Sequence, residues 1–86
     1  MPRPDPLTRK AFSLLTLRGV LRMREEGDTL LLGRPKASGV GVVLSYDLTT
    51  GKWTERSTER VGLGIFSACR TLGVGLEDVT GAIQDA

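Results

Sequence analysis

The chain has 86 residues, enough for one small domain with a single core, and its 40% hydrophobic and 26% charged residues are ordinary globular values that exclude a disordered chain. Histidine is absent and cysteine occurs once, which excludes imidazole catalysis, an internal disulfide and a zinc site, so we expect neither metal nor cofactor. The net charge is +2, but residues 1–24 hold six basic side chains and one acid (+6 − 1 = +5), an asymmetry that points to an anionic partner or to a solvated basic face.

The N-terminal segment is expected to be a mobile arm followed by a short helix. Residues 1–5 are rich in proline, which removes backbone donors and fixes φ, so they should hold neither helix nor strand. Asp5 and Pro6 have the pattern of an N-cap followed by proline at the first helical position. We expect a helix of about two turns from Pro6 to Ser13 or Leu14. Its apolar face would consist of Leu7, Ala11, Leu14 and Leu15.

A long β-hairpin is expected from Leu15 to Arg34, because apolar and polar residues nearly alternate from Leu15 to Arg24 as they do in a strand with one buried face. A continuous helix there would place arginines among the leucines and have no clean apolar stripe. The loop Glu25-Glu26-Gly27 would close the hairpin with glycine at positive φ, and Asp28–Leu32 would return as the second strand. The predicted register pairs Met23 with Thr29, Leu21 with Leu31, Arg22 with Leu30 and Val20 with Leu32.

Two further strands are expected after a loop. Gly33–Gly39 is rich in glycine, proline and serine and should be exposed, with its basic pair at the tip. Val40–Leu48 has the β-branched and aromatic content of a third strand. Thr49-Thr50-Gly51 again has the three-residue hairpin form with glycine at positive φ, so Lys52–Arg56 should pair back as a fourth strand.

The remainder of the chain is expected to be mainly helical. A helical face is formed by Val61, Ile65, Ala68 and Leu72. Gly62 and Gly64 are an objection, since glycine costs about 1 kcal/mol relative to alanine within a helix. Apolar residues also alternate over 61–65, which leaves a short fifth strand before a shorter helix open. Gly73 is a natural stop for the first helix, and Leu76–Gln84 should form the second.

These elements predict a single α+β domain spanning residues 1–86: a four-stranded antiparallel meander with a short N-terminal helix and a C-terminal helix pair, in the order α-β-β-β-β-α-α. Residues 66–84 resemble a helix-turn-helix unit with its turn at Leu72-Gly73-Val74. A recognition helix needs donors and basic groups, whereas this one offers Glu77 and Asp78. We therefore interpret the pair as helices that cover the core.

The most informative pattern is a mixed basic and apolar face of the predicted sheet. With a three-residue turn at 49–51, Trp53 lies opposite Asp47 and on the other side of the sheet from Tyr46. The face would contain Val20, Arg22, Arg24, Leu30, Leu32, Val43 and Trp53, with Arg34 and Lys36 at its margin and Arg18 one step further along the strand. Single-stranded nucleic acid is bound by cationic groups and flat side chains together. We therefore expect a small non-enzymatic module that binds single-stranded nucleic acid or another partner through Arg18, Arg22, Arg24, Arg34, Lys36 and Trp53.

Two alternatives stay open for the same face. Protein interfaces favour tryptophan, arginine and aliphatic side chains, so a homodimer or another protein partner fits equally well. The N-terminal helix could instead cover this face and leave only the arginine tips in water. The two binding hypotheses differ in salt dependence, because phosphate contacts weaken steeply as salt rises whereas an apolar dimer does not.

Neither a catalytic site nor a membrane segment is expected. The acids cluster in turns and near the C-terminus, with no apolar pocket that would raise a pKa for acid or base work. Cys69 has no histidine partner and is interpreted as a small buried hydrophobe. No apolar run approaches the roughly 20 residues of a membrane span, and the N-terminal apolar run lacks the features of a secretory leader, so a cytoplasmic protein is the expectation.

Overall fold

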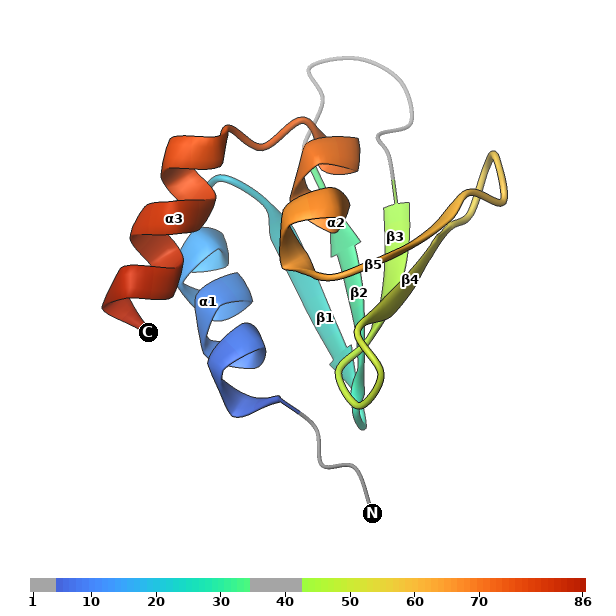
Figure 1. Cartoon of the computed structure of the whole chain (residues 1–86), viewed down its shortest axis with the longest axis horizontal. Helices are drawn as coiled ribbons and strands as arrows, with labels where there is room; N and C mark the ends of the chain where they lie inside the picture. The colour runs from blue at the N-terminus through green and yellow to red at the C-terminus, as the bar shows by residue number, and fades with distance from the viewer. Residues whose placement is uncertain (1–4, 35–42) are drawn as a thin grey trace.

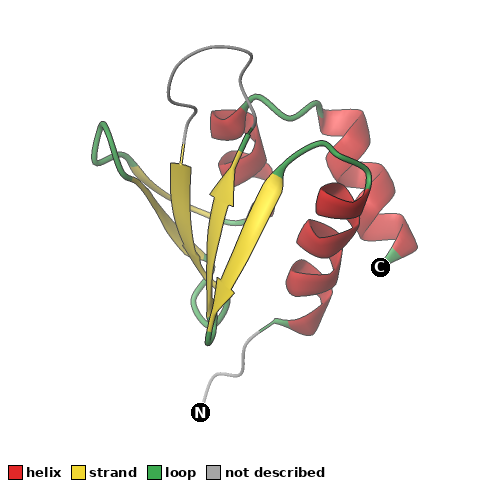
Figure 2. Cartoon of the chain, turned by 180° about the vertical axis from the view of Figure 1, so that it is seen from behind, coloured by secondary structure: helices red, strands yellow, loops and turns green. Residues whose placement is uncertain are grey.

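The computed structural model describes residues 5–34 and 43–86, which form a sheet with helices against one of its faces (Figure 1). The elements are α1 (Pro6–Leu17), β1 (Arg22–Glu26), β2 (Thr29–Gly33), β3 (Val43–Asp47), β4 (Lys52–Glu55), β5 (Val61–Leu63), α2 (Ile65–Leu72) and α3 (Leu76–Asp85). The strands pair antiparallel in the order β1-β2-β3-β4-β5, and the view from behind shows the same layering (Figure 2). The predicted N-terminal arm, the tip of the predicted loop and the start of the predicted third strand fall wholly or partly on residues 1–4 and 35–42, outside the described residues.

The predicted α+β class is confirmed, with an N-terminal helix, an antiparallel meander and a C-terminal helix pair. The sheet, however, has five strands rather than four, because Val61–Leu63 pairs with β4 instead of starting a helix. Gly62 is in this strand and packs against the Trp53 ring, and Gly64 precedes α2 with φ 88°. Neither glycine is inside a helix, so the cost of glycine within a helix does not apply to them. Helix α2 begins only at Ile65 and ends before Gly73, whose φ of 81° is the left-handed C-cap expected there.

Helix α1 continues to Leu17, so the predicted strand starting at Leu15 is wrong over its first residues. Leu15 is completely buried, as is Ala11 one helical turn earlier. Arg18 caps the helix, and Gly19, with φ 75°, donates its amide to the Thr16 carbonyl and turns the chain towards β1. In this last turn Leu15 belongs to the core and Leu14 packs against it, while α1 as a whole packs against α3. The alternation of apolar and polar residues in the sequence does not show these contacts with distant residues.

The first hairpin closes through the two-residue loop Gly27-Asp28, so the predicted three-residue loop and its register are wrong. The observed pairs are Arg22 with Gly33, Met23 with Leu32, Arg24 with Leu31, Glu25 with Leu30 and Glu26 with Thr29. Gly27 has φ 62°, which confirms the predicted positive φ, and glycine at the first loop position is typical of a type II′ turn. Met23 pairs with Leu32 rather than with the predicted Thr29, a difference of three residues. Because three is an odd number, Leu30 and Leu32, rather than Thr29 and Leu31, share the core face with Met23.

The second hairpin differs from the prediction by one residue of register. Tyr46 pairs with Trp53, so the two aromatic side chains lie on the same face and the predicted pairing of Trp53 with Asp47 is wrong. Strand β3 ends at Asp47, whose carboxylate accepts the amide of Thr49 at 2.8 Å and so begins the turn, and Leu48 after it is buried in the core. Gly51 has φ 77°, as predicted, although the connection is one residue longer.

The core lies between the helices and the covered face of the sheet. It contains Ala11, Phe12, Leu15, Leu21, Leu30, Leu32, Leu44, Tyr46, Leu48, Trp53, Ala68, Cys69, Leu72, Val74, Val79 and Ala82. Phe12 and Tyr46 meet edge to face with ring centroids 5.1 Å apart, which links α1 to β3. Trp53 Nε1 donates to Ser67 Oγ at 2.8 Å, which links β4 to α2. The predicted burial of Cys69 is confirmed, and that burial raises the pKa of its thiol to about 12.

Candidate functional site

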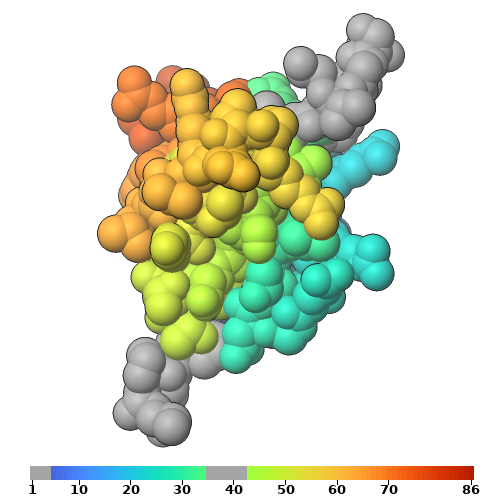
Figure 3. Space-filling model, turned by 90° about the vertical axis from the view of Figure 1, so that its right-hand side faces the viewer, coloured from blue at the N-terminus to red at the C-terminus, as the bar shows by residue number. Residues whose placement is uncertain are grey.

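The face of the sheet turned away from the helices is not covered by any described element. Side chains alternate along a strand, so the burial of Leu32, Leu44 and Trp53 on the helix side assigns their chain neighbours to the other side. We call this surface the open face. It consists of Arg22, Arg24, Glu26, Thr29, Leu31, Val43, Ser45, Asp47, Lys52, Thr54, Val61 and Leu63. Figure 3 shows the molecule from the right-hand side of Figure 1, where the strands face the viewer and α1 is out of view.

The chemistry of the open face changes from one sheet edge to the other. A single cross-strand row shows the gradient, because it runs through Arg24, Leu31, Ser45, Thr54 and Val61. The β1 edge is therefore basic, the centre carries hydroxyls, and the β5 edge is aliphatic. The formal charge of the whole face is small, with three basic side chains and two acids (+3 − 2 = +1).

Arg22 and Arg24 are the predicted site residues that the structure places on this face. Both are exposed on β1, two residues apart and therefore on the same side of the strand. Arg24 Nε lies 3.8 Å from Glu26 Oε1, whereas Arg22 has no ion-pair partner within the described ranges.

The structure does not bring the other predicted basic residues to this face. Arg18 is the C-cap of α1, not a strand residue, and its guanidinium pairs with the Asp85 carboxylate at the end of α3. The guanidinium of Arg34 donates to the Gly73 carbonyl beyond α2, so it serves the helix turn. The predicted placement of both residues on the sheet face is wrong for the same reason, because each side chain contacts the C-terminal helical region, which is distant in sequence. Lys36 lies outside the described residues.

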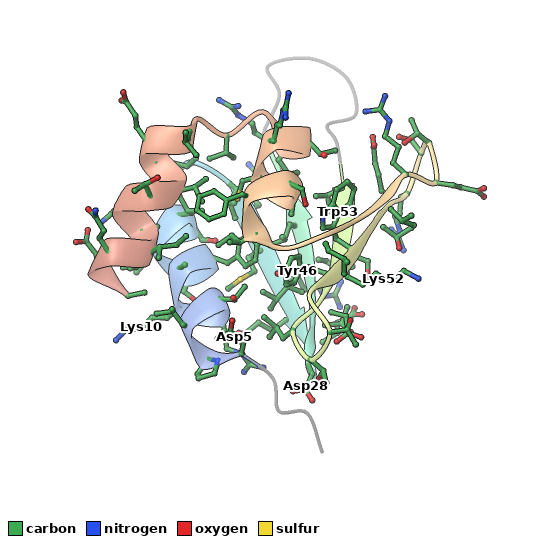
Figure 4. All side chains as sticks on the ribbon, viewed as in Figure 1. Asp5, Lys10, Asp28, Tyr46, Lys52 and Trp53 are labelled. Atoms are coloured by element: carbon green, nitrogen blue, oxygen red, sulfur yellow. The ribbon has the colours of Figure 1, made fainter. Side chains whose placement is uncertain are left out.

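Trp53 lies on the covered face, which removes the stacking aromatic from the predicted site. Its side chain is 4% exposed, packed under α2, and its indole N–H is already bonded to Ser67. In Figure 4, Trp53 and Tyr46 lie towards α2, whereas Lys52 points away on the other side of the strand. Leu30 and Leu32, also predicted on the mixed face, are in the core, and Val20 packs against the core from the connection before β1. For Trp53, Leu30 and Leu32 the error comes from the hairpin loops, which differ in length from those predicted, whereas Val20 is misplaced because β1 begins only at Arg22.

Several residues of the open face were not predicted as site residues. Leu31, Val61 and Leu63 belong to it through the observed register, and the alternation over 61–65 was the one sequence signal that could have placed the last two. Val61 and Leu63 are 61% and 69% exposed, which is unusual for aliphatic residues in a strand.

The titratable groups with shifted pKa values lie away from this face. The hydroxyl of Thr8 donates to Asp5, which caps α1, and this bond lowers the pKa of the Asp5 carboxyl. Burial, with a further contribution from the Asp5 charge, raises the pKa of Tyr46. Glu55 is buried but accepts the hydroxyls of Ser57 and Thr58, so its carboxylate holds the β4–β5 turn together.

Pockets of comparable volume occur on the helical side. One of about 500 Å³ is lined by Phe66, Ser67, Arg70, Val74, Leu76 and Val79, and another of about 500 Å³ by Pro6, Arg9, Lys10 and Ser13. Neither lining contains a carboxylate or a thiol, so neither supplies a nucleophile with an adjacent base. Within residues 5–34 and 43–86, no group of three or more cysteine, aspartate or glutamate side chains could hold a metal ion.

Comparison with models of known protein families, with curated proteins and with solved structures found no match. None of the helices in the described part of the chain is long and apolar enough to cross a membrane.

Proposed function

We propose that the chain is a non-enzymatic protein-interaction module that self-associates through its sheet. The observation that carries this proposal is the exposure of Val61 and Leu63 on a strand at the edge of a sheet whose open face has no cover. Aliphatic side chains in a strand normally contact a second layer, and their exposure marks an interaction surface.

The composition of the rest of the face supports the same proposal. Leu31 and Val43 extend the aliphatic surface across the sheet, and Arg22 and Arg24 border it. Interfaces between proteins combine an apolar centre with a polar rim in which arginine is enriched. The near-neutral charge of the face lets two copies approach without strong repulsion.

Sedimentation equilibrium and light scattering at micromolar concentration test the proposal. We expect a species of twice the 9.3 kDa chain mass whose population rises with concentration and holds or rises with salt. A constant mass of 9.3 kDa up to the highest soluble concentration would contradict it.

Single-stranded nucleic acid is a second candidate, favoured by the exposure of Arg22 and Arg24 on one strand face. Residues two apart on a strand are separated by about 6.6–6.8 Å, a spacing at which both guanidinium groups can reach neighbouring phosphates. The absence of Trp53 from the open face removes the base-stacking contribution that the sequence suggested, so binding would be almost entirely electrostatic.

Fluorescence anisotropy with a labelled oligonucleotide separates the two candidates. If phosphates bind here, replacing Arg22 and Arg24 by alanine should flatten the slope of log affinity against log salt by roughly 0.7 per lost contact. Lys10→Ala is a matched control, because Lys10 is an exposed cation on α1. No binding at low salt, or equal loss in the control, removes the nucleic-acid candidate.

A further inference from the structure

The outer edge of β5 carries backbone groups that no described residue satisfies. Glu55 donates its amide to the Arg60 carbonyl, and Gly64 donates its amide to the Gly51 carbonyl. Hydrogen-bonded pairs in an antiparallel ladder recur at every second residue, so Gly62, midway between Arg60 and Gly64, points its N–H and C=O towards β4. The backbone groups of Val61 and Leu63 therefore point outwards. Of these, the Leu63 carbonyl accepts the Ser67 hydroxyl, and the rest have no partner in residues 5–34 and 43–86.

The two edges of the sheet differ in how they are protected. Strand β1 carries Arg22, Arg24, Glu25 and Glu26, and charged side chains on an edge oppose pairing with another chain. Strand β5 has no charged residue, and both of its side chains are exposed and aliphatic. The β5 edge is therefore the one open to strand addition.

We propose that β5 pairs antiparallel with β5 of a second copy, about a two-fold axis that passes beside Gly62. This inference rests on the self-association proposed above and names the surface that produces it. In this register Val61 of each copy faces Leu63 of the other, and each such pair can exchange two backbone hydrogen bonds. The result is one continuous sheet through both copies.

The sequence of β5 is self-complementary in this register. The two-fold axis brings two Val61 and two Leu63 side chains into one aliphatic cluster on the open face, where cross-strand aliphatic pairs stabilise a sheet. The two Gly62 residues form the close pair at the axis, about 4.5 Å apart, and have no side chains to separate the strands. Arg60 falls opposite Gly64 of the second copy, so like charges do not face each other beside the axis.

Charge substitution tests whether association uses this edge. Val61→Lys and Leu63→Lys should each raise the dimer Kd by about tenfold or more, because two unpaired ammonium groups then enter the aliphatic cluster. Both wild-type side chains are exposed, so the variants should keep the monomer fold, which circular dichroism checks. Leu17→Lys is the matched control, because Leu17 is an exposed aliphatic residue at the end of α1, outside the sheet, and this variant should leave the Kd unchanged.

Cross-linking then tests the register. In a hydrogen-bonded pair the Cα atoms are about 5.5 Å apart, within the range of about 4.4–6.8 Å that a disulfide spans. Diagonal neighbours are about 7–8 Å apart, beyond that range. We therefore expect Val61→Cys protein mixed with Leu63→Cys protein to form a disulfide-linked dimer several-fold faster than either variant alone.

The outcomes separate this inference from the proposed function. If the wild type is a dimer but the β5 variants leave its Kd unchanged, or the mixed cross-link has no advantage, the edge register is wrong and self-association stands. If Leu31→Lys abolishes the dimer and the β5 variants do not, the contact lies on the open face rather than at the β5 edge. A wild type that stays at 9.3 kDa overturns both.

Discussion

The two faces of the sheet are built from alternate residues of the same strands, yet they have opposite environments. On the covered face Leu30, Leu44 and Trp53 contact the helices and are at most 4% exposed. On the open face their chain neighbours Leu31, Ser45 and Thr54 are half-buried or exposed. Whether a strand residue is in the core or on the open face therefore depends on whether its position is odd or even relative to its neighbours in the strand. A one-residue change in the length of a turn would exchange the two faces.

The largest effect that this contrast predicts is on Trp53. Trp53→Ala should lower the free energy of unfolding by about 3–5 kcal/mol, because it leaves a cavity beneath α2 and removes the indole N–H that donates to the Ser67 hydroxyl. Thr54→Ala, the next residue on the open face, should change stability by less than about 0.5 kcal/mol. Urea unfolding monitored by circular dichroism measures both. Similar losses for the two variants would mean that the faces are assigned wrongly.

The buried Cys69 thiol and a thiol introduced on the open face should differ in their rates of chemical modification. Burial raises the pKa of Cys69 from 9.0 to about 12, so its thiolate fraction at pH 8 should be lower by about a thousandfold than that of an ordinary thiol. A thiol reagent should modify Cys69 only after the protein unfolds. An exposed Thr54→Cys thiol, introduced on the open face, should react at once.

The same shift fixes the sign of one pH effect on stability. The folded pKa lies above the unfolded value, so this contribution to stability is fully present below about pH 9 and is lost as the pH rises towards 12. Cys69→Ala should make the loss of unfolding free energy between those pH values smaller, leaving the part due to Tyr46, whose pKa is also raised by burial. If wild type and variant lose stability in parallel, the thiol is not the source.

Alanine substitutions at two glycines, one behind Trp53 and one in α3, should change stability by smaller amounts and in opposite directions. A Cβ on Gly62 would lie 2.4 Å from Trp53 Cζ2, so Gly62→Ala should destabilise the fold by about 1–3 kcal/mol through overpacking. Gly81 is within α3, and a Cβ there would lie 3.7 Å from Arg18 Nη1, an ordinary contact. Gly81→Ala should therefore stabilise the protein by up to about 1 kcal/mol. Thermal unfolding at low protein concentration should give shifts of opposite sign.

The smallest effect is expected at the β4–β5 turn, away from both faces. Glu59 has φ 58° and is the one non-glycine residue with positive φ in the described part of the chain. Glu59→Gly should stabilise the protein by about 0.5–1 kcal/mol. The left-handed conformation costs a residue with a side chain about 1–2 kcal/mol, and part of this gain is offset because glycine loses more conformational entropy on folding. Glu59→Ala keeps the strain and should show no gain in the same thermal unfolding measurement.

Features that depend on neighbouring residues could be predicted from the sequence. The Asp5-Pro6 start of α1, the left-handed glycines at 27, 51 and 73, and the C-terminal helix pair follow from capping, φ preference and helical spacing. Each of these interactions spans a few residues, so a single sequence displays it. They were sufficient to predict the α+β class.

The positions of the predicted site residues depend on contacts between distant parts of the chain. Helix α1 continues through Leu15 because Leu15 is buried in the core and α1 packs on α3, and the Arg18 side chain pairs with Asp85 at the end of α3. Trp53 lies on the covered face because the connection between β3 and β4 is one residue longer than the three residues predicted, which pairs Trp53 with Tyr46. Local alternation fixes that neighbouring strand residues point to opposite sides, but which side meets the helices is set by contacts between residues far apart in the chain.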